Sequence, residues 1–250
     1  MLKSLNILIV CLFLFLAASS ANAGVISRAP NNLGLVGYWS FNDATSTTRS
    51  TLVQDFSGNN NNGVMTNMAN PATAVSGVAD GRLGKALSFD GSDDYVRVLT
   101  SSSLNFAGKV SLSAWIYPRI SNAYQAIVVK ASGVDQRQYA YYLSINGTSQ
   151  IFIALGTSNL GNVVVSPEWS VNQWNHIVLT ADGSNVKIYI NGVLANTTAG
   201  AYVSSVAAVD IGIGVDIPYG TFFTKGLIDE VRIYNRALSA DEVRSLYNSR

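Results

Sequence analysis

The sequence predicts an all-β fold of antiparallel sheets, and three observations support this prediction. Short runs rich in β-branched and aromatic residues alternate with polar residues, and turn-forming residues bound each run. Two of the runs lead directly into an Asn-Gly pair, at 146–147 and 191–192. Asn-Gly between apolar runs is typical of two-residue hairpin turns, in which both central residues adopt positive φ. No strand–helix–strand rhythm interrupts the pattern, which argues against a parallel sheet.

The expected strands follow one another at short intervals. In chain order they include 86–89, 95–98, 110–117, 141–145, 151–155 and 186–190. Antiparallel sheets of this kind bury one face, so every second residue of a strand points to the core. The residues expected to face inward are Leu112, Ala114, Ile116, Val186, Ile188, Ile190, Val231 and Ile233.

One short helix is predicted at the C-terminal end, within residues 237–247. Ser239 and Glu242 have the spacing of a capping box, and Leu238 and Val243 occupy the hydrophobic-staple positions around it. Nothing reactive lies on this helix, so we expect it to pack on the edge of the sandwich and to be structural.

The first 23 residues have the features of a secretory signal peptide. Lys3 supplies a positive start, residues 7–18 are apolar, and Ala21-Asn22-Ala23 matches a cleavage site. Residues 24–33 then form a short leader, and 34–250 form one domain. The only cysteine lies inside the signal peptide, so the mature chain has no thiol. The predicted location is secreted, either extracellular or periplasmic.

Charge and hydropathy argue against two classes of partner. The chain has 16 Lys and Arg against 15 Asp and Glu, and Lys3 belongs to the signal peptide, so the mature chain is balanced. No basic run is present, which argues against nucleic acid. Beyond the signal peptide no apolar stretch reaches the ~18 residues that a membrane helix needs.

Six segments, taken in order, resemble the LamG-like jelly-roll family of the concanavalin A-like lectin/glucanase superfamily. They are GLVGYWSFND (34–43), DFSGNNNNG (55–63), GRLGKALSFDGSDDYVRV (81–98), SLSAWIYP (111–118), NQWNHIVLTADGSNVKIYINGVL (172–194) and GLIDEVRIYNRALSADEVRSLY (226–247). The resemblance implies an antiparallel two-sheet jelly-roll sandwich from residue 34 onward. It also implies an extracellular binding or adhesion module, in many members with calcium, although this fold hosts lectins, glucanases and lyases alike.

The residues that glycoside hydrolysis needs are not paired in this sequence. That reaction uses two carboxylates facing each other across the scissile bond. The mature chain has only three glutamates, Glu168, Glu230 and Glu242, and no strand carries two acids on one face. His176 is the only histidine and lacks a partner at metal-ligand spacing, so we expect a structural role. We therefore expect a non-enzyme, with a polysaccharide hydrolase or lyase as the less favoured alternative.

The asparagine-rich segment 55–64, DFSGNNNNGV, offers oxygen atoms for calcium, which takes six to eight hard oxygen ligands. Asp55 and Asn60 are the first candidates. By strand alternation Asp229 would lie on the core-facing row, where an ionised carboxylate needs a partner. The resemblance implies that an Asp in this last segment helps to hold calcium, so the predicted structural site is Asp55, Asn60 and Asp229.

An alternative to calcium stays open. Asp55 would then form an Asx turn, and Asp229 would accept backbone N–H groups or pair with Arg232 or Lys225.

Aromatic residues outside the clear strand alternation form the predicted ligand surface. Sugar recognition combines aromatic platforms with amide and acid side chains. The candidates are Trp169, the only tryptophan in a loop context, with Tyr124, Tyr142 and Tyr219. The expected ligand is a carbohydrate or glycoconjugate. The alternative is an envelope or extracellular protein-interaction or adhesion module that binds other proteins and no sugar.

Overall fold

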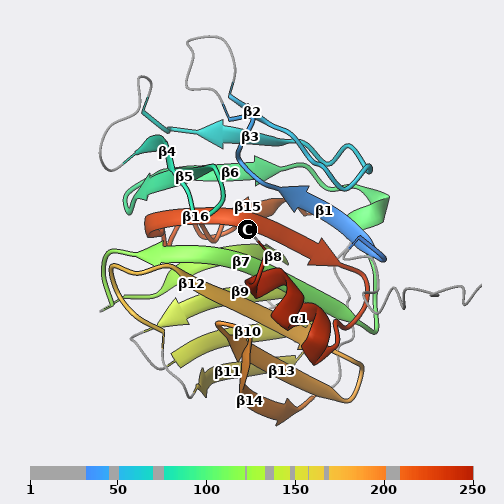
Figure 1. Ribbon diagram of the computed structural model, residues 1–250. Coiled ribbons are helices and arrows are strands. Elements are labelled where there is room, and N and C mark those ends of the chain that lie inside the picture. Colours follow the sequence, from blue (N-terminus) through green and yellow to red (C-terminus); the bar gives the residue numbers. More distant parts are fainter. Residues whose placement is uncertain are drawn as a thin grey trace, which may run out of the picture.

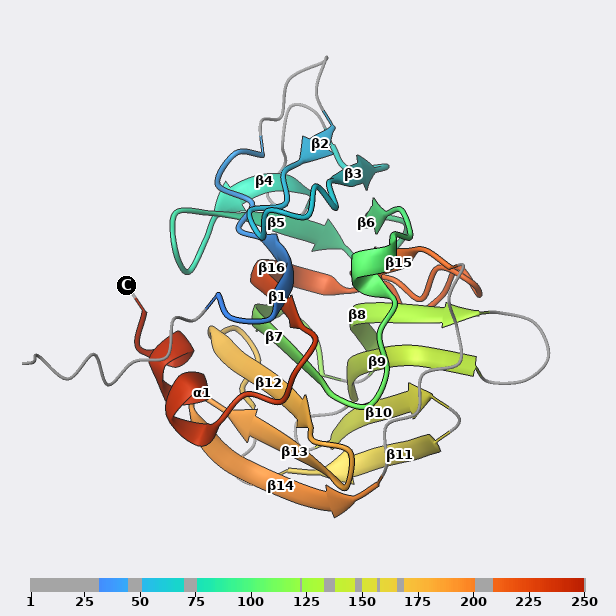
Figure 2. The same cartoon turned by 90° about the vertical axis from the view of Figure 1, so that its right-hand side faces the viewer.

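Two antiparallel sheets pack face to face, and one short helix follows the last strand (Figure 1). The computed structural model describes residues 32–44, 51–69, 76–121, 123–132, 138–146, 150–156, 158–165, 169–200 and 209–249. Over these residues the fold is the predicted jelly-roll sandwich, which confirms the fold class. In Figure 2 the two sheets are visible as separate layers.

The first sheet has the strand order β14-β13-β12-β7-β16-β5-β4, and β1 pairs with β16 beside this path. Its strands are β1 (Leu35–Trp39), β4 (Gly77–Asp80), β5 (Lys85–Asp90), β7 (Val110–Pro118), β12 (Asn175–Ala181), β13 (Asn185–Ile190), β14 (Val193–Ala199) and β16 (Lys225–Tyr234). The β13–β14 hairpin turns at Asn191 and Gly192, both with positive φ. That is the turn predicted from the Asn-Gly pair.

The second sheet has the order β11-β10-β9-β8-β15-β6-β3-β2. Its strands are β2 (Leu52–Val53), β3 (Gly63–Thr66), β6 (Tyr95–Val98), β8 (Gln125–Ser132), β9 (Gln138–Asn146), β10 (Gln150–Gly156), β11 (Ser158–Val164) and β15 (Ile211–Ile213). A short 3-10 helix, η1, covers Ser102–Leu104. The chain passes between the sheets more than once, so residues far apart in the sequence become neighbours on one face.

The core lies between the sheets and contains every residue predicted to face inward. These side chains are at most 2% exposed: Leu112, Ala114, Ile116, Val186, Ile188, Ile190, Val231 and Ile233. Period-two alternation therefore identified the buried face of β7, β13 and the second half of β16 correctly.

A β-bulge in β16 overturns the predicted orientation of Asp229. Register shifts between Asp229 and Arg232, and Glu230 has a φ of 55°. A bulge inserts one extra residue, so the inward row changes from one parity to the other across it. Ile228 faces the core before the bulge and Val231 after it. Asp229 pairs with Trp115 and lies on the outer face of the first sheet, not on the core-facing row.

Helix α1 (Ala240–Tyr247) begins after the capping box that the sequence predicts, with Ser239 and Glu242 bonded reciprocally. It lies across the outer face of the first sheet (Figure 2), not on its edge as expected. Its apolar side chains pack on outward residues of β12, β13 and β16, in a cluster formed by Val178, Tyr189, Tyr234, Leu238, Val243 and Leu246. The helix therefore buries a second face of the sheet.

Some predictions fall outside the described residues. The signal peptide, 1–23, lies outside them, as do residues 24–31 of the predicted leader. Of the helices that the structure describes, none has the length and apolar character needed to span a bilayer.

Candidate functional site

A pocket of about 600 Å³ lies on the outer face of the second sheet, on the side away from the core. Alternation along β9 and β10 creates its floor. Tyr141 and Leu143 point into the core, and Tyr142 between them points outward. Phe152 does the same on β10, between Ile151 and Ile153. Tyr124, Tyr139, Tyr142, Phe152, Asp216, Tyr219, Thr221 and Phe222 line the pocket.

The loop between β15 and β16 supplies the wall of the pocket. A tight turn closes it, in which Asp216 N–H donates to Thr221 O at 3.0 Å and Gly220 N–H donates to Asp216 O at 2.9 Å. Gly220 has a φ of 57°, which glycine adopts without steric cost. The Phe222 carbonyl accepts a hydrogen bond from Ala126 N–H at 2.8 Å, which anchors the loop to β8.

The aromatic rings of the pocket stand at steep angles to one another. Tyr139 and Tyr142 are nearly perpendicular, at 87° with ring centroids 5.5 Å apart, and Tyr142 meets Phe152 at 78° and 5.2 Å. Tyr124 meets Phe152 at 84° and Phe222 at 56°. Three of these contacts are edge-to-face, an arrangement that aromatic pairs favour. The rings therefore do not form one flat shelf.

Asp216 is the one ionisable acid or base among the described lining residues that carries charge near neutral pH. It is only 2% exposed, and its Oδ2 accepts a hydrogen bond from the Tyr142 hydroxyl at 3.0 Å. Burial raises the pKa of Asp216 to about 6, and the Tyr142 hydrogen bond opposes that rise. Burial, and then the Asp216 charge, raise the pKa of Tyr142, so this hydroxyl stays a donor. The Oδ1 atom of Asp216 has no hydrogen-bond partner among the described residues.

Three of the four predicted ligand residues meet in this pocket. Tyr124, Tyr142 and Tyr219 come from β9 and two separate loops and line one space. Trp169 does not join them. It is 1% exposed within the hydrophobic core, which corrects its reading as a surface platform. Hydrogen bonds between Ser170 and the Asn175 side chain, at 2.7 and 2.9 Å, hold the following segment down.

The prediction did not single out Phe152, Asp216 and Thr221, which also line the pocket. Phe152 could have been found from alternation, because its neighbours on β10 face the core. The D-x-P-x-G pattern at 216–220, followed by two phenylalanines, is typical of a turn with unusual apolar bulk. The role of Asp216 depends on Tyr142, 74 residues away, and no local pattern signals that contact.

The asparagine-rich loop is organised around the Asp55 carboxylate. Its Oδ1 accepts hydrogen bonds from the backbone N–H groups of Tyr38 and Ser57 at 2.8 and 2.9 Å. Its Oδ2 accepts from Ser57 Oγ at 2.8 Å and from Asn61 N–H at 2.9 Å. A carboxylate has about four acceptor positions, so these donors fill them. Asp55 thus forms the Asx turn that the sequence left open as the alternative.

Asn61, and not Asn60, carries the buried contacts of this loop. Asn60 is exposed and has a φ of 58°, so it serves the turn itself. Asn61 is 4% exposed, and its amide donates to Val36 O at 2.7 Å and to Ser103 Oγ at 3.0 Å. The backbone carbonyl of Asn61 accepts a hydrogen bond from the Trp39 indole N–H at 2.9 Å. The loop therefore fastens β1 to η1.

Asp229 lies under the turn between β4 and β5. Its Oδ2 accepts from Leu83 N–H at 2.9 Å, and its buried Oδ1 has no partner among the described residues. Gly81 is required for this approach, because a methyl group there would meet Asp229 Oδ2 at 2.6 Å. Burial raises the pKa of Asp229 to about 7. Arg232 pairs with Glu230 and not with Asp229.

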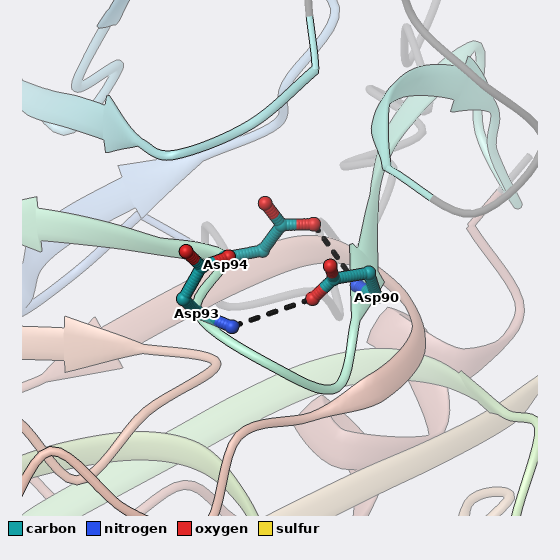
Figure 3. A group of neighbouring side chains, drawn as sticks. All are labelled: Asp90, Asp93 and Asp94. Carbon is teal, nitrogen blue, oxygen red and sulfur yellow. Dashed lines mark hydrogen bonds between the residues drawn. The ribbon is translucent and has the colours of Figure 1, made fainter.

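Three aspartates gather at the turn that carries the chain from β5 to β6 (Figure 3). Ligand atoms of Asp90, Asp93 and Asp94 lie within 4.8 Å of one another. Two of the side chains already serve the turn: Asp90 Oδ1 accepts from Ser92 N–H at 2.7 Å, and Asp94 Oδ2 accepts from Asp90 N–H at 2.9 Å. Burial raises the pKa of Asp94.

His176 and Ser113 form a hydrogen-bonded pair, Oγ to Nε2 at 2.9 Å, on the outer face of the first sheet. Both residues are at most 1% exposed beneath helix α1 and its contacts. Burial lowers the pKa of His176 to about 3, so the ring is neutral. A substrate cannot reach this serine, and the pair is a structural hydrogen bond.

Comparison with known proteins agrees with the fold. A family model described as the concanavalin A-like lectin/glucanases superfamily matches residues 90–244. No match was found among curated proteins.

Solved structures similar to the chain have low sequence identity to it. Domain 4 of AbnA, a GH43 extracellular arabinanase from Geobacillus stearothermophilus solved with arabinotriose, is 23% identical with a TM-score of 0.59, over 86% of this chain and 98% of that one. The binding domain of Paraclostridial Mosquitocidal Protein 1 is 20% identical with a TM-score of 0.62, over 88% and 53%. Trypanosoma rangeli sialidase, with the inhibitor DANA, is 14% identical with a TM-score of 0.60, over 85% and 32%. This chain therefore spans about half the length of the mosquitocidal binding domain and about one third of the length of the sialidase.

Proposed function

This chain belongs to the concanavalin A-like lectin/glucanase superfamily, and we propose on that premise that it is a non-catalytic carbohydrate-binding protein. The glycan binds in the aromatic pocket formed by β9, β10 and the loop between β15 and β16. The observation that carries the proposal is the pocket itself. Its volume falls within the ~300–1,000 Å³ range of small-ligand sites, and the pocket combines six aromatic rings with one buried carboxylate.

The chemistry of the pocket suits sugar binding. Aromatic faces pack against the C–H groups of a sugar ring, and a carboxylate oxygen accepts hydrogen bonds from its polar groups. The arabinanase domain solved with arabinotriose supports the same class of ligand. Arabinan oligosaccharides are therefore among the first neutral probes to test.

The arrangement of acids supports binding without hydrolysis. Two facing carboxylates are needed to cleave a glycosidic bond. Asp216 is the only carboxylate among the described lining residues. We expect no release of reducing sugar from polysaccharides that the protein binds. Release that disappears in Asp216→Asn would instead favour a hydrolase.

Tyr219→Ala is expected to weaken glycan binding by about 1–3 kcal/mol, by analogy with the stacking of a nucleic-acid base on an aromatic side chain. Tyr219 is 50% exposed at the pocket rim, so the fold should not depend on it. Binding is measured by glycan array and then by calorimetry on the best ligand.

Phe56→Ala is the matched control, because Phe56 is 49% exposed and lies in the asparagine-rich loop. It should bind as the wild type does. Equal losses in both variants would mean that the pocket is not the glycan site. A blank array, together with capture of an extracellular or envelope protein by the same surface, would favour the adhesion alternative.

The proposed setting is outside the cytoplasm, because residues 1–23 have the composition of a secretory signal peptide. A glycan on a cell surface or in a secreted polysaccharide is then within reach. Removal of residues 1–23 during export, seen by mass spectrometry of the mature N-terminus, tests this part.

We also propose that a structural calcium ion binds at Asp229. The buried, unpartnered Oδ1 of Asp229 suits a cation, whereas Asp55 has no acceptor position left. Asn42 Oδ1 reaches the same turn, where it accepts from Lys85 N–H at 2.7 Å. An ion there would neutralise a buried charge and staple the β4–β5 turn to β16.

Addition of EDTA is expected to lower the melting temperature of calcium-loaded protein, because an ion that binds only the folded state stabilises it. Asp229→Asn should remove this shift. If the shift persists in Asp229→Asn and disappears in Asp93→Asn, the ion lies at the three aspartates of Figure 3. Identical wild-type melting curves with and without EDTA would contradict a structural calcium ion.

A further inference from the structure

The charge of the pocket selects among sugars. Among its described lining residues there is one carboxylate, Asp216, and no lysine, arginine or histidine. A buried carboxylate is costly unless an opposite charge or hydrogen-bond donors compensate for it. One oxygen of Asp216 accepts a hydrogen bond from Tyr142, while the other is buried and has no partner among the described residues. A positive group of the ligand would complete the pair.

The donors of the pocket are few. The described lining side chains carry only hydroxyl groups as donors, those of the tyrosines and Thr221, and the Tyr142 hydroxyl already donates to Asp216. Acidic sugars, with a carboxylate of their own, would face Asp216 with no cation to offset the repulsion. Neutral sugars would satisfy Asp216 with hydroxyl donors but leave its charge unpaired. An ammonium group brings both three donors and the opposite charge.

The ring arrangement leads in the same direction. Neighbouring rings stand at 56–87° to one another, so the pocket is lined by rings in several orientations. A cation is attracted to the face of an aromatic ring within about 6 Å, and several rings around one cation form an aromatic cage. Several rings of different orientation beside a buried carboxylate suit a compact cation on a small apolar frame.

We infer that the ligand of this pocket is a glycan whose sugar carries a free ammonium group, as an unacetylated amino sugar does. The inference rests on the proposed glycan-binding function and narrows it to one class of sugar. The ammonium group lies against Asp216 and between the faces of Tyr139, Tyr142 and Phe152, and the rest of the sugar packs towards Tyr124 and Phe222.

The test compares two ligands that differ only in charge: a glucosamine oligosaccharide and the fully N-acetylated oligosaccharide of the same length. Calorimetry at neutral pH is expected to show the wild type binding the amine form about tenfold tighter or more, the scale of one desolvated cation–π and ion contact. Asp216→Asn keeps the size of the side chain and an oxygen to accept from Tyr142. It should bind both forms alike, at the level of the acetylated one.

Asp241→Asn is the control for net charge. The Asp241 side chain is 91% exposed on helix α1, which packs against the first sheet, whereas the pocket lies on the second sheet. This variant should therefore keep the full preference for the amine form. Loss of preference in Asp241→Asn as well would show that the effect is long-range and would overturn the role of Asp216. Unchanged melting temperature of Asp216→Asn ensures that its result is not caused by unfolding.

Three outcomes distinguish a failure of the ammonium inference from a failure of the proposed glycan-binding function. Equal wild-type affinity for the two forms, with Tyr219→Ala weakening both, would sink the ammonium inference and leave glycan binding intact. No binding of any charged or neutral oligosaccharide would sink both. If tetramethylammonium chloride binds as tightly as the glucosamine oligosaccharide, the pocket recognises an ammonium group without recognising a sugar. That result would also overturn the inference.

Discussion

Trp169→Ala is expected to lower the free energy of unfolding by about 3–5 kcal/mol, the range for removing a large aromatic side chain from a core. The indole is 1% exposed among the apolar side chains between the two sheets. Its removal leaves a cavity that the strands on either side cannot fill, because each is held in a ladder. Urea denaturation, followed by fluorescence and circular dichroism, measures the loss.

Tyr219→Ala serves as the control for this variant, since both residues were predicted from the sequence as ligand platforms. Tyr219 is 50% exposed, and its removal should change stability by no more than about 0.5 kcal/mol. If Trp169→Ala is as stable as the wild type and loses glycan affinity, then the tryptophan lies on the surface and the burial described above is wrong.

Asn61→Ala is expected to cost about 2–4 kcal/mol, because it leaves buried polar groups without partners. The Val36 carbonyl would lose its donor at 2.7 Å, and the Ser101 and Ser103 hydroxyls would lose Asn61 Oδ1, which lies 2.6 Å from Ser101 Oγ. These groups join the asparagine-rich loop to β1 and η1. Thermal and urea melts of the same variant measure the effect.

Asn60→Gly is the matched control one residue away. Asn60 is exposed, and glycine accepts its positive φ without steric cost, so the change should stay within about 0.5 kcal/mol. A large loss in Asn60→Gly with little effect of Asn61→Ala would mean that Asn60 holds something that the loop contacts do not include. A calcium-dependent loss would favour the ion site predicted from the sequence.

The fold was readable from the sequence because its determinants are local. Alternation in β7 and β13, the Asn-Gly turn at 191–192 and the capping box at Ser239 each depend on residues within a few positions of one another. The resemblance to a known family covered the same segments and added the arrangement of two sheets. Burial of all eight predicted inward residues follows from these signals.

The orientation of Asp229 was not readable, because a single inserted residue reverses the parity of a strand. Alternation assumes an unbroken ladder, and Glu230 breaks it with a φ of 55°. The Asp229 side chain therefore lies on the outer face of the first sheet, whereas unbroken alternation predicts the core-facing side. The carboxylate remains buried, but beneath the β4–β5 turn and not within the core.

The sequence by itself determined the β class, the core-facing rows of β7 and β13, the capped helix and a supply of aromatic residues for a ligand surface. Only the tertiary structure decided which aromatics share a space. Tyr142 and Asp216 are 74 positions apart, and they come to 3.0 Å because β8 pairs with β9 on one side and with β15 on the other. Trp169 is not on this surface, because its side chain is buried in the core between the sheets. Local patterns set which way a side chain points from its strand, whereas a binding pocket depends on contacts between distant segments, and those form only when the sheets are packed.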